Sequence, residues 1–119
     1  ETEEEEEDDD DGEAPPTGRS RAVAGVSLKG LEGHAKGQTI RVETIPFVIG
    51  RRASNDLHLD DARASGRHAQ IVHDAGVFYV EDLDSTNGTM VNGARISRQA
   101  LKNQDEIQMG KLRIGITLP

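Results

Sequence analysis

The sequence predicts an all-β domain, either a β-sandwich or a barrel, that follows an acidic segment. From Val23 to the C-terminus, short runs of alternating apolar and polar residues are separated by Gly, Asn and Asp, which is typical of strands joined by tight turns. No segment sustains the 3.6-residue apolar period of a helix. With 119 residues, of which 34% are apolar, the chain can form one domain with a modest core.

The N-terminal segment has a different composition. Residues 1–13 hold 11 of the 22 carboxylates and no Lys or Arg, whereas residues 14–119 hold 14 basic residues against 11 acidic ones, a net charge of +3. A segment so charged and so poor in apolar side chains cannot bury enough surface to offset the entropy lost on ordering. We therefore expect a disordered acidic tail over residues 1–22 and a mildly basic domain over residues 23–119.

The alternating runs predict the strands of this domain in order. The first strand is followed by a Gly-rich connection, and the third begins at Pro46, a position where a missing N–H is tolerated. The expected strands, in chain order, are 23–30, 38–44, 46–51, 68–73, 77–82, 105–109 and 111–118.

Turn residues join these strands. Residues 74–76, "DAG", predict a three-residue hairpin loop with Gly where a positive φ is favoured. Asn92-Gly93 predicts the two-residue turn of a short hairpin over 89–96. Residues 97–104 are expected to form one helical turn at most.

Several kinds of chemistry are excluded or disfavoured. The chain has no Cys, so disulfides, thiol catalysis and zinc–cysteine sites are excluded. In the Gly-rich stretch 30–39, Lys36 precedes Gly37, the wrong order for a phosphate loop, so this stretch is interpreted as a connection. No Ser lies on a strand-to-helix elbow, and no group of histidines has metal-ligand spacing. We therefore expect no enzymatic activity, no catalytic residues, no cofactor and no metal.

Membranes and nucleic acids are also disfavoured as partners. No apolar run approaches the ~18 residues of a membrane span. The chain begins at Glu1 rather than Met, as a fragment of a longer protein would. Only Phe47, Phe78 and Tyr79 are available to stack on bases, and a net charge of +3 attracts a polyanion weakly. A cytoplasmic location is the default expectation.

Arginines and hydroxyls near turns point instead to phosphate recognition. Arg51 directly follows Gly50 and a strand, so its guanidinium can leave the sheet edge, and a planar guanidinium matches two phosphate oxygens at once. Ser65 and Thr86 supply hydroxyl donors for the remaining oxygens. Further candidate ligand-binding residues on these loops are Arg52, Arg67 and Ser85.

Five short stretches, taken in order, resemble the signature of the forkhead-associated (FHA) domain, a phosphothreonine-binding β-sandwich. They are "IGR" at 49–51, "NDLHLDD" at 55–61, "S-x-x-HA" at 65–69, "DLDSTNGT" at 82–89 and "VNG" at 91–93. Each stretch is weak alone, but five in register with the right gaps are highly specific. The resemblance covers the whole of the expected domain.

The resemblance implies an eleven-stranded FHA-type β-sandwich whose ligand-binding loops gather at one end. Arg51 resembles the family's phosphate-gripping arginine, and Ser65 resembles its phosphate-binding serine. Thr86 stands where the family has a side chain beside the phosphate, and Asn87 resembles the asparagine that hydrogen-bonds the peptide backbone. The residues expected to hold the loops are Gly50, Asn55, His68, Gly88, Asn92 and Gly93.

One position departs from the family pattern. The residue after Ser65, where the family usually carries Arg, Lys or Asn to contact phosphate, is Gly66. Either a neighbouring arginine takes this role, from among Arg52, Arg63 and Arg67, or the affinity for phosphate is lower than usual.

The implied function is that of a non-catalytic signalling module. It would bind proteins or peptides that carry phosphothreonine made by Ser/Thr kinases; the alternative is a protein-interaction scaffold with a weakened phosphate site. Thr2 and Thr17 are candidate phosphosites in the tail. One hypothesis for residues 1–20 is a weak intramolecular contact with the basic binding face, and the other is a plain linker role.

Overall fold

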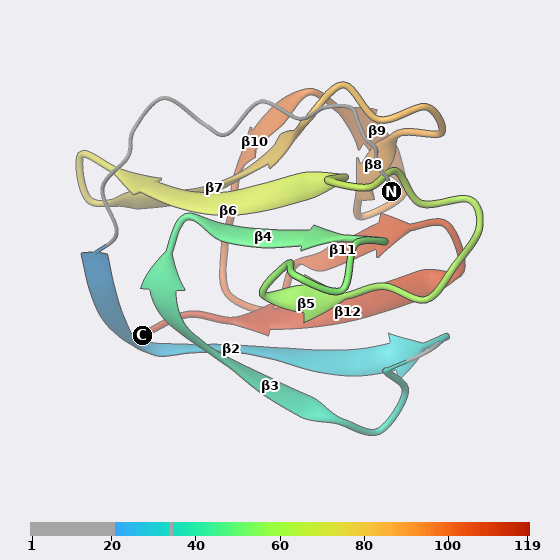
Figure 1. Ribbon diagram of the computed structural model, residues 1–119. Helices are drawn as coiled ribbons and strands as arrows, with labels where there is room; N and C mark the ends of the chain where they lie inside the picture. Colours follow the sequence, from blue (N-terminus) through green and yellow to red (C-terminus); the bar gives the residue numbers. More distant parts are fainter. Residues whose placement is uncertain (1–20, 34) are drawn as a thin grey trace.

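The structure is a sandwich of two β-sheets (Figure 1). The computed structural model describes residues 21–33 and 35–119, so Thr2, Thr17 and the expected disorder of residues 1–20 lie outside the described residues. The eleven strands of the described part are β2 (Arg21–Glu32), β3 (Thr39–Ile45), β4 (Phe47–Gly50), β5 (Leu57–His58), β6 (Ala69–Asp74), β7 (Val77–Asp82), β8 (Thr89–Val91), β9 (Ala94–Ile96), β10 (Arg98–Ala100), β11 (Glu106–Met109) and β12 (Leu112–Thr117).

The strands form one five-stranded and one six-stranded sheet. The first has the order β10-β7-β6-β4-β5 and the second the order β3-β2-β12-β11-β8-β9. Paired strands run antiparallel, except β4 and β5, which are parallel. The predicted all-β sandwich with eleven strands is confirmed.

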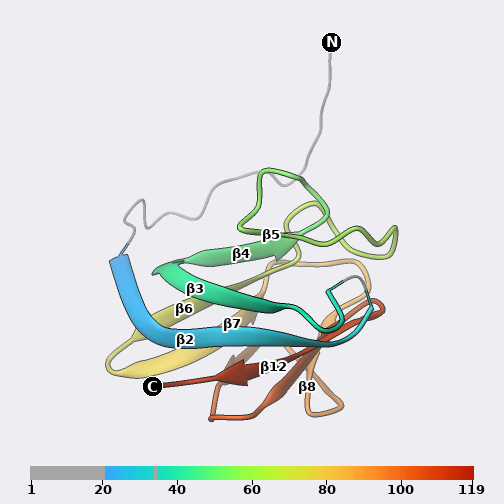
Figure 2. The ribbon, with the colours of Figure 1, turned by 90° about the horizontal axis from the view of Figure 1, so that it is seen from below.

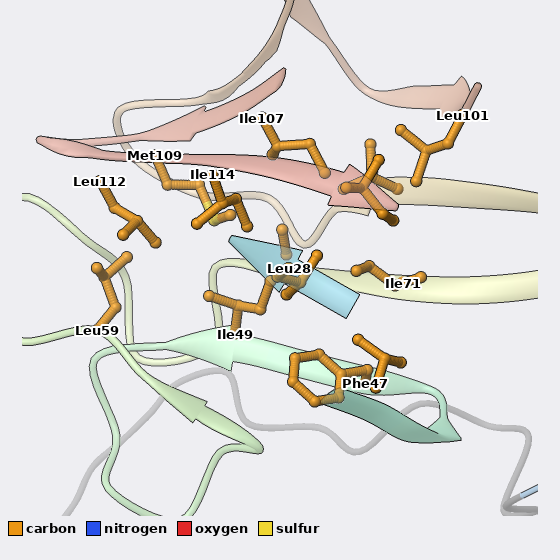
Figure 3. Close-up of a cluster of buried hydrophobic side chains, with 14 of the residues drawn as sticks. Leu28, Phe47, Ile49, Leu59, Ile71, Leu101, Ile107, Met109, Leu112 and Ile114 are labelled. Atoms are coloured by element: carbon orange, nitrogen blue, oxygen red, sulfur yellow. The ribbon is translucent and has the colours of Figure 1, made fainter. Parts of the chain in front are cut away.

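Alternate side chains of the strands fill the space between the sheets. In β12, Leu112, Ile114 and Ile116 are buried, while the residues between them are only partly buried, which is the two-residue period of a strand with one face inward. Figure 3 shows Leu28 of β2 and Ile114 of β12 lying close to Ile49 of β4, across the sandwich. Each such buried side chain contributes about 1.5–3 kcal/mol. The core therefore fixes the positions of the sheet ends.

One prediction about the connections was wrong. Asp74 pairs with Val77, so the β6–β7 turn has two residues, Ala75 and Gly76, both with positive φ, as in the type I′ turn that matches strand twist. In residues 97–104, where at most one helical turn was expected, residues 98–100 form strand β10, which pairs with the edge of β7.

The first strand also starts earlier than expected. Arg21 and Ala22, assigned to the tail by the sequence prediction, belong to β2. Arg21 pairs with Ile45 of β3, and its guanidinium donates a hydrogen bond of 2.7 Å to the carbonyl oxygen of His73. These contacts link the first residues of β2 to both sheets.

The strand register brings three loops to one end of the sandwich. Ile49 pairs with Ala69, and Ala69 pairs with Asp82, so the end of β4, the start of β6 and the end of β7 lie side by side. The β4–β5 loop (51–56), the β5–β6 loop (59–68) and the β7–β8 loop (83–88) all leave from there. Figure 2 shows the chain on either side of β5 extending beyond the strands. Within residues 21–33 and 35–119, no helix is long and apolar enough to cross a membrane.

Candidate functional site

Backbone hydrogen bonds join the β4–β5 loop to the β5–β6 loop. The N–H of Arg51 donates to the carbonyl oxygen of Ser65 at 2.9 Å, and the N–H of Arg52 donates to that of Gly66 at 3.1 Å. Closer to the sheet, the N–H of His68 donates to the carbonyl of Ile49 at 2.9 Å. These bonds continue the pairing of β4 with β6 beyond the strands, so that Arg51 and Ser65 are fixed as neighbours.

Gly50 makes this close approach possible. A Cβ added there would lie 2.8 Å from the backbone nitrogen of His68 and 2.8 Å from Nδ2 of Asn55, and it would clash with the carbonyl oxygen of Gly66. Nδ2 of Asn55 donates to that same carbonyl at 2.6 Å. Asn55 therefore holds the two loops together where only glycine leaves room.

His68 connects the β5–β6 loop to the β7–β8 loop. Its ring is fully buried, its Nδ1 accepts a hydrogen bond of 3.1 Å from the N–H of Ser65, and its Nε2 lies 2.8 Å from the carbonyl oxygen of Gly88. Because a backbone N–H can only donate, Nδ1 is unprotonated and Nε2 carries the proton. The neutral imidazole therefore bridges a donor on one loop and an acceptor on the other.

The β7–β8 loop is organised around the carboxylate of Asp82. This carboxylate accepts hydrogen bonds from the N–H of Ser85 at 3.0 Å, from the hydroxyl of Ser85 at 2.5 Å and from the hydroxyl of Thr89 at 2.7 Å. The Ser85 hydroxyl in turn accepts from the N–H of Gly88 at 2.9 Å. Ser85, expected to contact ligand, is buried, with its hydroxyl engaged inside the loop.

Ser65, Thr86 and Asn87 meet where these two loops face each other. The N–H of Thr86 donates to Oγ of Ser65 at 3.1 Å, and Nδ2 of Asn87 donates to the carbonyl oxygen of Arg63 at 2.7 Å. The side chains of Thr86 and Asn87 are exposed. After these contacts, the Ser65 hydroxyl still has its proton to donate, and Asn87 keeps its amide oxygen and a second N–H.

Three arginines lie near this group in different settings. Arg51 is exposed, and within residues 21–33 and 35–119 its guanidinium forms no hydrogen bond or ion pair. Arg52 is half-buried, and its Nε lies 3.2 Å from the point where a Cβ on Gly66 would be. Arg67 is half-buried beside His68. The open position at Gly66 is thus filled by the side chain of Arg52.

The second Asn-Gly pair has the structural role that the sequence predicted. Asn92 and Gly93 both have positive φ, 50° and 87°, and close the β8–β9 hairpin as a two-residue turn. The side chain of Asn92 also contacts β11, donating to Asp105 at 3.0 Å and accepting from the N–H of Glu106 at 2.9 Å.

Sequence reasoning missed two carboxylates that hold the loops. Besides Asp82, Asp61 accepts from the N–H groups of Lys111 at 2.8 Å and Arg63 at 2.9 Å. These two backbone bonds, Lys111 first, hold the pKa of Asp61 below its usual range. The Asp82 network has a sequence signal, namely a Ser three residues after Asp82 and a Thr seven residues after it. Asp61 has no such signal, because its partner Lys111 lies 50 residues away in the sequence.

Comparisons with known proteins agree with this architecture. The family model of the FHA domain matches residues 47–110. The oxoglutarate dehydrogenase inhibitor of Corynebacterium efficiens is 37% identical over 105 residues, which cover 87% of this chain and 74% of that protein. The glycogen accumulation regulator GarA of Mycolicibacterium smegmatis is 43% identical over 65 residues, 55% of this chain and 41% of that protein.

Solved structures give the same result. A structure from an analysis of phosphothreonine-dependent FHA domain interactions superposes with a TM-score of 0.71 at 31% identity, covering 81% of this chain and 98% of that one. Mycobacterium tuberculosis EmbR in complex with a low-affinity phosphopeptide gives 0.74 at 30% identity, covering 80% of this chain and 24% of that one. The matched family model, the relatives and the sandwich with its three joined loops together place this chain in the FHA domain family.

Proposed function

We propose that this domain binds segments of partner proteins that carry phosphothreonine, and that Arg51, Ser65, Thr86 and Asn87 form the binding site. The observation that supports it best is that the joined loops hold an exposed arginine, a serine hydroxyl and exposed threonine and asparagine side chains at neighbouring positions of the backbone. Arg51 is bonded through its backbone to Ser65, and Ser65 is bonded through its hydroxyl to Thr86. Structural relatives that are described as phosphothreonine-dependent or phosphopeptide-bound support the choice of ligand.

Each group has a distinct part in holding the ligand. A phosphothreonine carries a charge of about −1.5 to −2 and three strong acceptor oxygens. Arg51 supplies parallel N–H donors and a positive charge, and the hydroxyls of Ser65 and Thr86 donate to the remaining oxygens. Asn87, anchored through Nδ2 to the Arg63 carbonyl, offers its amide oxygen and second N–H to the peptide backbone.

Arg52 is the second phosphate-binding arginine in this proposal. Its guanidinium approaches the open face of Gly66, next to Ser65, where a longer side chain at position 66 would otherwise stand. Arg67, which precedes the buried His68 and is half-buried like Arg52, is a further candidate. Ser85 supports the loop from inside rather than touching ligand, since Asp82 and Gly88 occupy its hydroxyl.

The cellular role follows from the ligand. A module of this kind acts without catalysis: it recruits or senses cytoplasmic partners after Ser/Thr kinases have phosphorylated them. The Corynebacterium efficiens relative is an inhibitor of an enzyme and GarA is a regulator, which supports a regulatory rather than an enzymatic role. In the proposed division of the chain into an acidic tail and a domain, partner binding belongs to the domain.

The acidic tail is proposed to compete weakly for the same face. Residues 1–13 carry a net charge of −11 against +3 for the rest of the chain, and phosphorylation of Thr2 or Thr17 would add a ligand in cis. Screening over about 10 Å at 0.1 M salt makes the competition salt-dependent. Peptide affinity should rise at low salt when residues 1–20 are deleted; equal affinities with and without them would leave the tail a linker.

A titration with three matched peptides tests the phosphate site. The best peptide from a degenerate phosphothreonine library is compared with its phosphoserine and unmodified versions by fluorescence anisotropy. We expect binding only with phosphate, preference for phosphothreonine, and at least a tenfold loss in Arg51→Ala, since a charged hydrogen bond nets about 1.5–3 kcal/mol. Arg41→Ala, which removes another exposed positive charge, from β3, should change little. Equal binding of phosphorylated and unmodified peptides would favour the alternative function, a protein-interaction scaffold with a weakened phosphate site. The absence of a side chain at Gly66 is the sequence feature that fits this alternative.

A further inference from the structure

Arg95 of β9 lies directly over the β7–β8 loop. If Gly88 carried a Cβ, it would be 2.5 Å from Nε of Arg95, 2.8 Å from Cζ and 3.1 Å from Nη2. The guanidinium therefore occupies the space that a side chain at position 88 would fill, and the φ of +90° at Gly88 suits glycine there. Arg95 reaches this position from the β8–β9 hairpin, where it pairs with Met90.

The peptide beneath Arg95 is held firmly. The N–H of Gly88 donates to Oγ of Ser85 at 2.9 Å, and its carbonyl oxygen accepts from the buried ring of His68 at 2.8 Å. Asn87, the residue proposed to bond the peptide backbone, immediately precedes it. The guanidinium of Arg95 thus rests on a fixed platform at the border of the proposed binding site.

This positive charge is not neutralised within the described part of the chain. Arg98 pairs with Glu81 and Asp74, and Arg113 pairs with Glu32 and Glu106. Arg95, by contrast, is exposed and has no hydrogen bond or ion pair to any residue in 21–33 or 35–119. A planar guanidinium that is seated, exposed and without a carboxylate is suited to receive one from a ligand.

We propose that Arg95 is a specificity-determining residue that recognises an acidic side chain of the bound peptide, separate from the phosphothreonine. The inference rests on the proposed function. From Thr86 to Gly88 the chain can span at most about 7 Å, and an extended peptide advances about 3.3–3.6 Å per residue. An Asp or Glu within a few residues of the phosphothreonine can therefore reach Arg95 while the phosphate is held by Arg51.

The test uses the full chain and peptide libraries with a central phosphothreonine. Each flanking position is fixed in turn as Asp, Ala or Lys, and affinities are measured for the unmodified domain, Arg95→Ala, Arg95→Glu and the matched control Arg41→Ala. We expect one position at which Asp binds about two- to fivefold tighter than Ala, the range of an exposed ion pair. Arg95→Ala should abolish this preference, Arg95→Glu should reverse it in favour of Lys, and Arg41→Ala should leave it unchanged.

The outcomes separate this inference from the proposed function. A structural role for Arg95 alone would lower affinity for every library member equally, and that result would overturn the inference. So would an Asp preference that persists in Arg95→Glu but is lost in Arg63→Glu, since another loop arginine would then be the reader. If the domain without substitutions bound phosphorylated and unphosphorylated peptides equally well, the proposed function itself would be overturned. That comparison does not need any Arg95 variant.

Discussion

Removing the carboxylate of Asp82 should destabilise the β7–β8 loop by an amount that the hydrogen bonds predict. In Asp82→Ala, the hydroxyls of Ser85 and Thr89 lose their common acceptor, and Thr89 is completely buried. An unsatisfied buried hydroxyl costs about 1–3 kcal/mol, so with two hydroxyls the free energy of unfolding should fall by about 2–6 kcal/mol. That is a large part of the 5–15 kcal/mol typical of a domain.

The measurement is chemical denaturation combined with a double-mutant cycle. Ser85→Ala already removes one of the two hydroxyls, so adding Asp82→Ala to it leaves one hydroxyl, that of Thr89, and the backbone N–H of residue 85 without their acceptor. The loss of free energy of unfolding in the double variant should therefore be about 1–2 kcal/mol smaller than the sum of the losses in the two single variants, since residues in one network do not act independently. Asp60→Ala, an exposed carboxylate on the β5–β6 loop, is the control and should change the free energy of unfolding by less than about 0.5 kcal/mol.

Two results would contradict this reasoning. Additive effects of Asp82→Ala and Ser85→Ala would mean that their hydrogen bond contributes nothing beyond each residue alone. A loss no larger than that of Asp60→Ala would mean that water or another group replaces the carboxylate. Either result would remove the Asp82 network as the reason why Thr86 and Asn87 hold their positions.

Two further predictions concern the other contacts that hold the loops. In His68→Gln, the Ser65 amide should exchange its hydrogen markedly faster and peptide affinity should fall, because the imidazole no longer bridges Ser65 and Gly88; unchanged protection of this amide by NMR would refute the bridge. Because the pKa of Asp61 is lowered in the folded state, its stabilising effect is present above the unfolded value near 3.9 and is lost as the pH falls through the folded pKa. The stability difference between the unmodified domain and Asp61→Asn should therefore be constant between about pH 5 and 7 and shrink below about pH 4; a difference that does not depend on pH would show that the charge is irrelevant.

The regular part of the fold could be predicted because its information is local. Alternation in 77–82 and 112–118 and the Asn92-Gly93 turn depend on neighbouring residues only, and the structure places strands and a hairpin there. Strand β10 could not be predicted this way, because its residues show little alternation of apolar and polar side chains. They form a strand through their pairing with β7. The same limit applies to β5, whose two residues form a strand only beside β4.

In the loops of the proposed site, too, some features could be predicted from neighbouring residues and others could not. The residues proposed to bind phosphate could be selected by the chemical type of their side chains and by their positions near turns. Whether a hydroxyl faces inward or outward could not: Ser85 and Thr86 are adjacent, yet one is buried by Asp82 and the other is exposed. The position of Arg95 could not be predicted either, because nothing in the sequence of its hairpin indicates that its side chain lies over Gly88, seven residues earlier.

The pairing of Gly66 with Arg52 gives the most direct test of how this domain differs from its family. A Cβ at position 66 would lie 3.2 Å from Nε of Arg52 and 3.5 Å from its Cγ, so in Gly66→Ala the flexible arginine must move while the backbone can stay. We expect stability to change by less than about 1 kcal/mol, whereas affinity for a phosphothreonine peptide should fall about as far as in Arg52→Ala.

The combination of the two substitutions decides the matter. If Gly66→Ala acts only by displacing Arg52, the double variant should bind no more weakly than Arg52→Ala alone, because neighbours that share one contact are not additive. Full affinity in Gly66→Ala would show that Arg52 does not need the open position to reach the phosphate. Full affinity in Arg52→Ala as well would leave Arg51, Ser65 and Thr86 as the whole of the phosphate site.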